Sequence, residues 1–199
     1  MVRLAVIHYS QTGNVHQMAQ SVARTAEQEG AEVRLRKVRE LAPAEAIASN
    51  ENWRAHLEAT ADVPEAEVDD LDWADAVMWG TPTRYGGPTA QIRQFVDQTG
   101  PLWNRGGLVD KVMSTFTSSA TSHGGQESTI LAMNNAFYHW GAIIVGPGYT
   151  DPRMFDLELG NPYGASHIAS AGPVGESTRT ELAIQTRRVL SVAARLKGE

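Results

Sequence analysis

The 199-residue sequence predicts a doubly wound α/β fold, in which helices cover both faces of a five-stranded parallel sheet. Short apolar runs typical of strands alternate with segments of helical periodicity, which is the order of parallel βαβ units. Loops rich in hydroxyl groups and glycine follow the first, third and fourth runs, where such sheets bind ligands. The length suits one domain, residues 1–199.

Five segments have the composition of strands. Residues 3–9 (RLAVIHY), 76–80 (AVMWG) and 142–146 (AIIVG) are short apolar runs, and residues 111–118 (KVMSTFTS) form a more polar one. Residues 31–38 (AEVRLRKV) alternate apolar with charged residues, which predicts a half-exposed edge strand.

Four segments between and after these runs predict helices. The first covers residues 15–29 and is followed by Gly30, a helix stop signal. The others cover residues 89–99, 126–138 and 178–197, and the last carries its apolar residues on one stripe.

Two stretches depart from the alternation. Residues 40–67 are rich in alanine and glutamate and predict an insertion of irregular helix. Residues 147–175 are rich in glycine and proline without sustained periodicity, which predicts a long ordered loop. A loop of that length inside a compact domain is usually functional or packed against a partner.

Composition excludes several classes of function. A formal net charge of −6 argues against nucleic acid and against an anionic membrane surface. No apolar run is long enough to span a bilayer, and the first predicted strand starts too close to Met1 for a signal peptide. The absence of cysteine excludes disulfides and thiolate metal sites, and it favours a cytoplasmic location.

Histidine, aspartate and glutamate show no metal-ligand spacing, so we expect no metal. His8 lies inside a predicted strand and is expected in the core or at an interface. His16 and His56 are expected at the surface. His167 belongs to the long loop and could approach a neighbouring site.

The loop YSQTGN, residues 9–14, directly precedes the first predicted helix. A helix amino terminus offers unpaired N–H groups and a positive dipole end, which favour phosphate. The loop has no lysine and fits neither GxxxxGK[ST] nor GxGxxG, so it suits a terminal monophosphate better than a triphosphate or a dinucleotide. The alternative is that its Ser, Thr and Asn side chains only cap the helix.

The chain resembles a known family at several motifs. YSQTGN is similar to the phosphate loop of flavodoxins, whose cofactor is FMN. GTPTRYGG (80–87), FVDQTGPLW (95–103) and HGGQEST (123–129) resemble the WrbA family of flavodoxin-like NAD(P)H:quinone oxidoreductases. NPYGAS (161–166) extends the resemblance toward the last helix.

This resemblance implies a flavodoxin-like fold, bound FMN and NAD(P)H as co-substrate. The positions that match the family's FMN contacts are Ser10, Gln11, Thr12, Gly13, Asn14, Val15, Pro82, Thr83, Arg84, Tyr85, Gly86, Ser118, Ser119, Ala120, Thr121, Ser122, His123, Gly124 and His139. The chain departs from the family pattern at Thr12, where a tyrosine is common, and at Trp140, which replaces the second of two adjacent histidines. The loop from Ser118 to Gly124 is one residue longer.

The same resemblance assigns catalytic positions to Tyr85, Trp103 and His139. Aromatic faces would accept nicotinamide or quinone by stacking, and His139 could donate a hydrogen bond or proton to a quinone oxygen. For three of these residues a purely structural role is the alternative. Trp103 could only fill a subunit contact, His139 could only stack or cap a helix, and Arg84 could pair with a surface carboxylate.

The sequence therefore predicts FMN-dependent two-electron reduction of quinones by NAD(P)H, with ping-pong hydride transfer through flavin N5. One alternative is a one-electron carrier of the flavodoxin type, and another is a non-enzymatic FMN-binding regulatory protein. A carrier would want an acidic rim, whereas Arg84, Arg93, Arg105 and Arg153 lie in or near the candidate segments. The family resemblance further implies a homotetramer with its sites at subunit interfaces.

Overall fold

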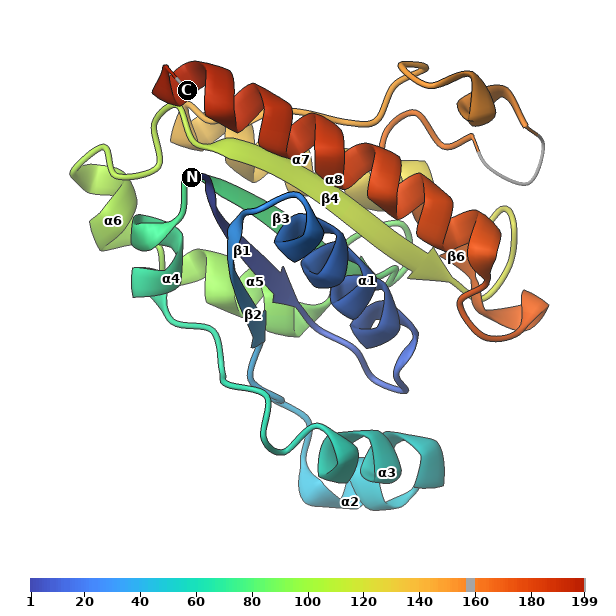
Figure 1. Cartoon of the computed structure of the whole chain (residues 1–199). Coiled ribbons are helices and arrows are strands. Elements are labelled where there is room, and N and C mark those ends of the chain that lie inside the picture. Colours follow the sequence, from blue (N-terminus) through green and yellow to red (C-terminus); the bar gives the residue numbers. More distant parts are fainter. Residues whose placement is uncertain (157–159, 199) are drawn as a thin grey trace.

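The computed structural model describes residues 1–156 and 160–198, and its centre is a parallel sheet (Figure 1). The strand order is β2-β1-β3-β4-β5, with β6 beside β4. The strands are β1 (Arg3–His8), β2 (Glu32–Lys37), β3 (Ala76–Pro82), β4 (Val112–Ser119), β5 (Ile143–Ile144) and β6 (Ser166–Ile168). Successive strands are added first to one side of β1 and then to the other, so the order has a switch point between β1 and β3, as in other doubly wound sheets. The predicted fold class is confirmed.

Helices lie on both faces of the sheet. One face is covered by α1 (Asn14–Gln28) and α8 (Glu176–Lys197). The other is covered by α4 (Val68–Trp73), α5 (Ala90–Asp97), α6 (Gly100–Asn104) and α7 (Gln126–Trp140). Each main helix matches a segment predicted from periodicity, with its ends moved by one or two residues.

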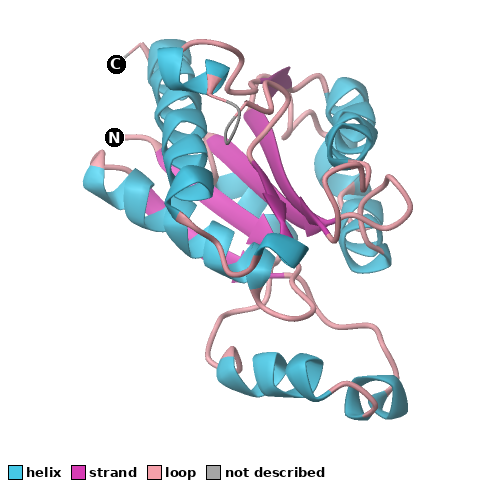
Figure 2. Cartoon of the chain, turned by 90° about the vertical axis from the view of Figure 1, so that its right-hand side faces the viewer, coloured by secondary structure: helices cyan, strands magenta, loops and turns pink. Residues whose placement is uncertain are grey.

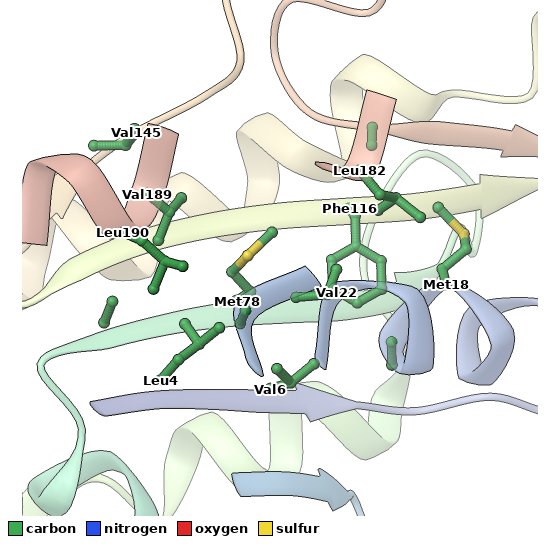
Figure 3. Close-up of a cluster of buried hydrophobic side chains, with 14 of the residues drawn as sticks. Leu4, Val6, Met18, Val22, Met78, Phe116, Val145, Leu182, Val189 and Leu190 are labelled. Atoms are coloured by element: carbon green, nitrogen blue, oxygen red, sulfur yellow. The ribbon is translucent and has the colours of Figure 1, made fainter. Parts of the chain in front are cut away.

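Strand alternation divides the buried side chains between two cores. Leu4 and Val6 of β1 point toward α1 and α8, where Val22 and Val189 pack against them (Figure 3). Ala5 and Ile7 belong to the opposite core. In that core Trp140 lies 5.9 Å from Trp79 and 5.6 Å from Phe137, measured between ring centroids.

Residues 43–60 form an arm that stands away from the sheet (Figure 2). Its two short helices, α2 (Ala44–Ala48) and α3 (Glu51–Ala59), contain no buried residue. Glu40 holds the base of the arm, because its carboxylate accepts hydrogen bonds from three side chains. The donors are Tyr9 Oη at 2.8 Å, Trp53 Nε1 at 2.9 Å and Gln91 Nε2 at 2.7 Å.

A Glu40→Ala variant is expected to loosen this arm, because the three donors lose a common acceptor. We expect faster amide hydrogen exchange across α3 and a loss of about 2 kcal/mol of unfolding free energy. Glu58→Ala is the control, since Glu58 makes only an exposed ion pair with Arg54 on the same helix. Equal exchange rates in the two variants would contradict the role assigned to Glu40.

The stretch at residues 147–175 contains regular secondary structure that was not predicted. It contains the 3-10 helices η1 (Pro152–Phe155) and η2 (Ala169–Ala171) and the strand β6. The prediction of a loop throughout was therefore wrong for these parts, and residues 157–159 lie outside the described residues. The predicted fifth strand, residues 142–146, is reduced to the two residues of β5.

β5 and β6 share one side of β4. Ile143 pairs with Val112 at the start of β4, whereas β6 pairs with Thr117, Ser118 and Ser119 at its end. A three-residue strand between glycine-rich segments is too short to show periodicity, which is why the sequence did not reveal it.

Two polar side chains of α8 fix the segment that leads into β6. Glu181 accepts the backbone N–H groups of Asn161 at 3.0 Å and Ser166 at 3.2 Å. Burial raises the pKa of Glu181 to about 7, although these N–H groups favour the charged form. One turn later, Gln185 accepts the N–H of Ala165 at 2.8 Å and donates to the carbonyl of Thr115 at 2.9 Å. The segment is thus tied to the middle of the sheet.

Candidate functional site

A cavity of about 280 Å³ opens where three loops meet at the carboxyl edge of the sheet. These are the loops that follow β1, β3 and β4, as the fold class predicts. The lining residues are Ser10, Gln11, Thr12, Asn14, Val15, Pro82, Thr83, Arg84, Ser118, Ser119, Ala120, Thr121, Gly124 and Ala169. Every one except Ala169 belongs to the set named from the sequence. Ala169 follows β6, the strand that was not predicted.

The first loop presents the amino terminus of α1 to this cavity. Ser10 Oγ accepts the N–H of Gly13 at 3.1 Å and closes the turn before the helix. Gly13 has a φ of +106°, which favours glycine. No side chain caps α1, so its first N–H groups have no side-chain acceptor, and Asn14 and Val15 of its first turn line the cavity. The capping alternative therefore does not explain the loop, and an anion fits it.

The second loop is held in place from two sides. The hydroxyl oxygens of Thr83 and Thr129 are 2.7 Å apart, which joins the loop to α7. Arg84 donates from Nη2 to Gln11 Oε1 at 2.6 Å, which joins it to the first loop. Arg84 makes no ion pair with a carboxylate among the described residues, so the surface-pair alternative is not what this structure has.

Tyr85 lies at the tip of the second loop. Its φ of +52° is unusual for a residue with a side chain, and its ring is fully exposed. The predicted contacts Tyr85 and Gly86 thus stand at the rim, outside the cavity lining. A ring held in this way is available to a flat ligand that approaches from solvent.

The third loop curls back on itself after β4. Ser119 Oγ donates to the carbonyl of Thr121 at 2.7 Å and accepts from Gln126 Nε2 at 2.9 Å. A Cβ on Gly124 would lie 2.7 Å from Ser119 Cβ, so the curl requires glycine there. Ser122 and His123, also predicted as contacts, are exposed and do not line the cavity.

Trp103 and His139 lie together, but far from this cavity within one chain. Trp103 Nε1 donates to the carbonyl of His139 at 2.9 Å. His139 is near the end of α7, just before β5, which pairs with the first residue of β4. The cavity lies at the other end of β4, a strand of eight residues. At about 3.3 Å per residue, roughly 25 Å separate the two ends.

Three histidines gather behind the first loop. His8 Nε2 lies 2.9 Å from His16 Nδ1, and the rings of His16 and His56 are 5.5 Å apart. His16 was predicted at the surface but is buried, and His56 is half-buried. The cluster was missed because its members come from β1, α1 and α3, which meet only in the fold.

This cluster is uncharged at neutral pH. Burial, together with repulsion from His16, lowers the pKa of His8 to about 3. Burial and the charge of a protonated His56 lower the pKa of His16 to about 4. No group of three or more His, Asp or Glu residues in the described part of the chain is arranged to hold a metal ion. Across the same residues, no helix combines the length and apolar character needed to cross a membrane.

Comparisons with known proteins show the family of the chain. Residues 2–151 match the family described as NADPH-dependent FMN reductase. A protein of Deinococcus radiodurans named NAD(P)H dehydrogenase (quinone) is 45% identical, over 99% of this chain and 98% of its own. A protein of Aromatoleum aromaticum with the same name is 43% identical, over 98% and 97%.

Solved structures share the fold at lower identity. A flavodoxin, WrbA-like protein from Agrobacterium tumefaciens superposes with a TM-score of 0.69 at 24% identity, covering 98% of this chain and 99% of that one. A flavodoxin from the domain Archaea gives a TM-score of 0.60 at 16% identity, covering 98% and 99%.

Proposed function

This chain belongs to the NADPH-dependent FMN reductase family, among its flavodoxin-like NAD(P)H dehydrogenases (quinone), and we propose how its residues carry out that activity. The family resemblance found in the motifs is confirmed, and the enzyme binds FMN and reduces quinones with NAD(P)H. The observation that carries the residue assignment is the cavity at the uncapped amino terminus of α1, walled by three polar loops.

Ser10 to Val15 hold the FMN phosphate. The N–H groups of the first turn of α1 and the hydroxyls of Ser10 and Thr12 donate to its oxygens, and the helix dipole favours its negative charge. The loop contains no lysine or arginine, so a permanently bound monophosphate suits it better than a phosphate that is transferred.

The second and third loops hold the isoalloxazine ring from its two sides. Bound FMN would supply the two-electron redox chemistry between NAD(P)H and the quinone. The N–H and hydroxyl groups around Thr83 and Ser118 stabilise negative charge at the ring edge without adding a competing base. One cavity mouth serves both substrates, so they bind in turn and the kinetics are ping-pong.

Trp103 and His139 serve the cavity of a neighbouring copy in a homotetramer. Support comes from exposed apolar side chains on the surface of α6 and α7 and the segment between them, which suits an interface. Their exposed fractions are 51% for Trp103, 53% for Val109, 46% for Leu131 and 69% for Tyr138. We also place the enzyme in the cytoplasm, which fits a sequence without cysteine.

The spectrum and the transient kinetics of the purified protein test this proposal. We expect a yellow protein whose flavin absorbance is lost on mixing with NADH and recovered on mixing with benzoquinone. Double-reciprocal plots at several quinone concentrations should be parallel. A protein that takes up no FMN would contradict the site, and bound flavin that NAD(P)H does not reduce would favour the one-electron carrier.

A Trp103→Ala variant is expected to lower kcat/KM for quinone about tenfold while FMN stays bound, because an aromatic wall is removed from a neighbouring site. Leu196→Ala removes another exposed apolar side chain and should leave kcat/KM unchanged. Sedimentation of both variants shows whether the tetramer is intact, and so whether a lower kcat/KM comes from the missing aromatic ring or from dissociation of the subunits. Unchanged constants in a tetrameric Trp103→Ala enzyme would remove Trp103 from the site, and a monomeric wild type would contradict the tetramer.

A further inference from the structure

A second hollow, with a volume of about 500 Å³, lies between α8 and the connection from β5 to β6. Figure 1 shows this connection in orange beside the red helix. The hollow shares no lining residue with the cavity at α1. We call it the arginine groove, because it is lined by Arg153, Arg187, Arg188 and Arg195.

The charge of the groove is unusual for this protein. Among the described residues, four guanidinium groups and one carboxylate, that of Asp151, line it, although the whole chain has a net charge of −6. From Ile184 to Lys197 α8 carries four basic residues and no acidic one. The helix dipole explains basic residues in the last turn only, and Arg187 pairs with Glu29, so Arg188 is left without either explanation.

Two of the four arginines are already paired, and two are not. Arg153 makes a two-pronged contact with Asp151, at 2.9 and 2.7 Å, and Arg187 pairs with Glu29 at 2.7 Å. For Arg188 and Arg195 no carboxylate of the described residues lies within ion-pair distance. The guanidinium groups of Arg188 and Arg195 therefore line the groove without a carboxylate partner among the described residues.

We propose that the arginine groove binds a linear oligophosphate. Guanidinium forks match phosphate oxygens two at a time, which makes arginine well suited to this ligand. Arg188 and Arg195 are seven residues apart, which is about 10.5 Å along a helix axis, so they start from successive positions along one face of α8 and can contact neighbouring phosphates of one chain. Ser191 lies between them and adds a hydroxyl donor. A chain of phosphates fits this row of donors.

The remaining lining sets the specificity. The apolar side chains in the groove are aliphatic, from Ile184 and Val192, and no aromatic ring lines it. A nucleobase would therefore find no stacking partner, and recognition rests on the phosphate chain. Inorganic polyphosphate and the phosphate tail of a nucleotide share this chemistry.

Calorimetric titration of the FMN-loaded enzyme with sodium tripolyphosphate tests the proposal, because bound FMN keeps the probe out of the cavity at α1. We expect saturable binding by the wild type at low salt. In Arg188→Ala/Arg195→Ala the affinity should fall at least tenfold, with quinone turnover unchanged. Arg188→Lys/Arg195→Lys should keep part of the affinity, since charge is retained but the fork is lost.

The matched control is Arg54→Ala/Arg105→Ala, which removes the same charge at exposed ion pairs outside the groove. It should bind tripolyphosphate like the wild type. A second titration with ATP identifies the source: tighter binding of tripolyphosphate indicates inorganic phosphate chains, and tighter binding of ATP indicates a nucleotide. No saturable binding of either probe, or an equal loss in the control variant, would overturn the proposal.

Discussion

A Gly164→Ala variant is expected to lose about 3 kcal/mol of unfolding free energy and much of its affinity for FMN. The new Cβ would overlap the carbonyl oxygen of Thr115 and lie 3.1 Å from Ile130 Cδ1. That carbonyl already accepts a hydrogen bond from Gln185 and belongs to β4, so it cannot move away cheaply. The segment before β6 must shift instead, and Ala169 in the cavity wall shifts with it.

Urea denaturation and fluorescence titration with FMN measure the two effects. Gly100→Ala is the control, because a Cβ there would meet no atom within 4 Å and the position is the first residue of a helix. The control should be neutral or slightly stabilising. A Gly164→Ala protein as stable as the control would show that the segment before β6 is not held against the sheet.

Lowering the pH from 7 to 5 is expected to destabilise the protein by about 2 kcal/mol, as the sum of opposing contributions. His8 and His16 have folded pKa values of about 3 and 4, against 6.5 for the unfolded chain. The unfolded state therefore binds protons first as the pH falls, and each histidine costs about 2 kcal/mol by pH 5. His56, the third member of the cluster, and Lys37, which faces it, act in the same direction by repulsion.

Glu181 opposes this loss. Its folded pKa of about 7 exceeds its usual value of 4.5, so its stabilising contribution is fully present below pH 4.5 and is lost as the pH rises through 7. Acidification from pH 7 to 5 thus increases the unfolding free energy by about 2 kcal/mol through this one carboxyl group. Its removal in Glu181→Gln should raise the total loss to about 4 kcal/mol.

Urea titrations at pH 7, 6 and 5, with FMN at a fixed excess, measure how the unfolding free energy changes with pH. His8→Gln should reduce the loss of unfolding free energy between pH 7 and pH 5 by about 2 kcal/mol, because one buried histidine is removed. A wild-type protein equally stable at pH 5 and 7, with Glu181→Gln showing the same flat profile, would contradict the neutral histidine cluster.

Much of the fold and of the site could be predicted because the signals are local. Apolar runs and helical spacing placed the main strands and helices to within one or two residues. The polar composition after β1, β3 and β4 located the cavity, because the carboxyl ends of parallel strands share one edge. The loop that contains Gly13 precedes a helix start, as predicted, and the structure shows that no side chain caps this helix.

Other features had no local signal. β6 has three residues, and its place beside β4 depends on Glu181 and Gln185 of a helix that follows it in the chain. His8 and His16 were read one at a time, and their contact exists only because β1 and α1 pack together. The arginine groove likewise needs Arg153 from a loop to meet the arginines of α8.

The sequence by itself determined the doubly wound fold and the family, since these follow from residue order and spacing. Only the tertiary structure decided which predicted residues share a cavity. It brought Ser10, Thr83 and Ser118 together and placed Trp103 and His139 at the opposite edge of the sheet. The physical reason is that spacing along a chain sets the direction of a side chain within its own element, whereas distance between elements is set by packing.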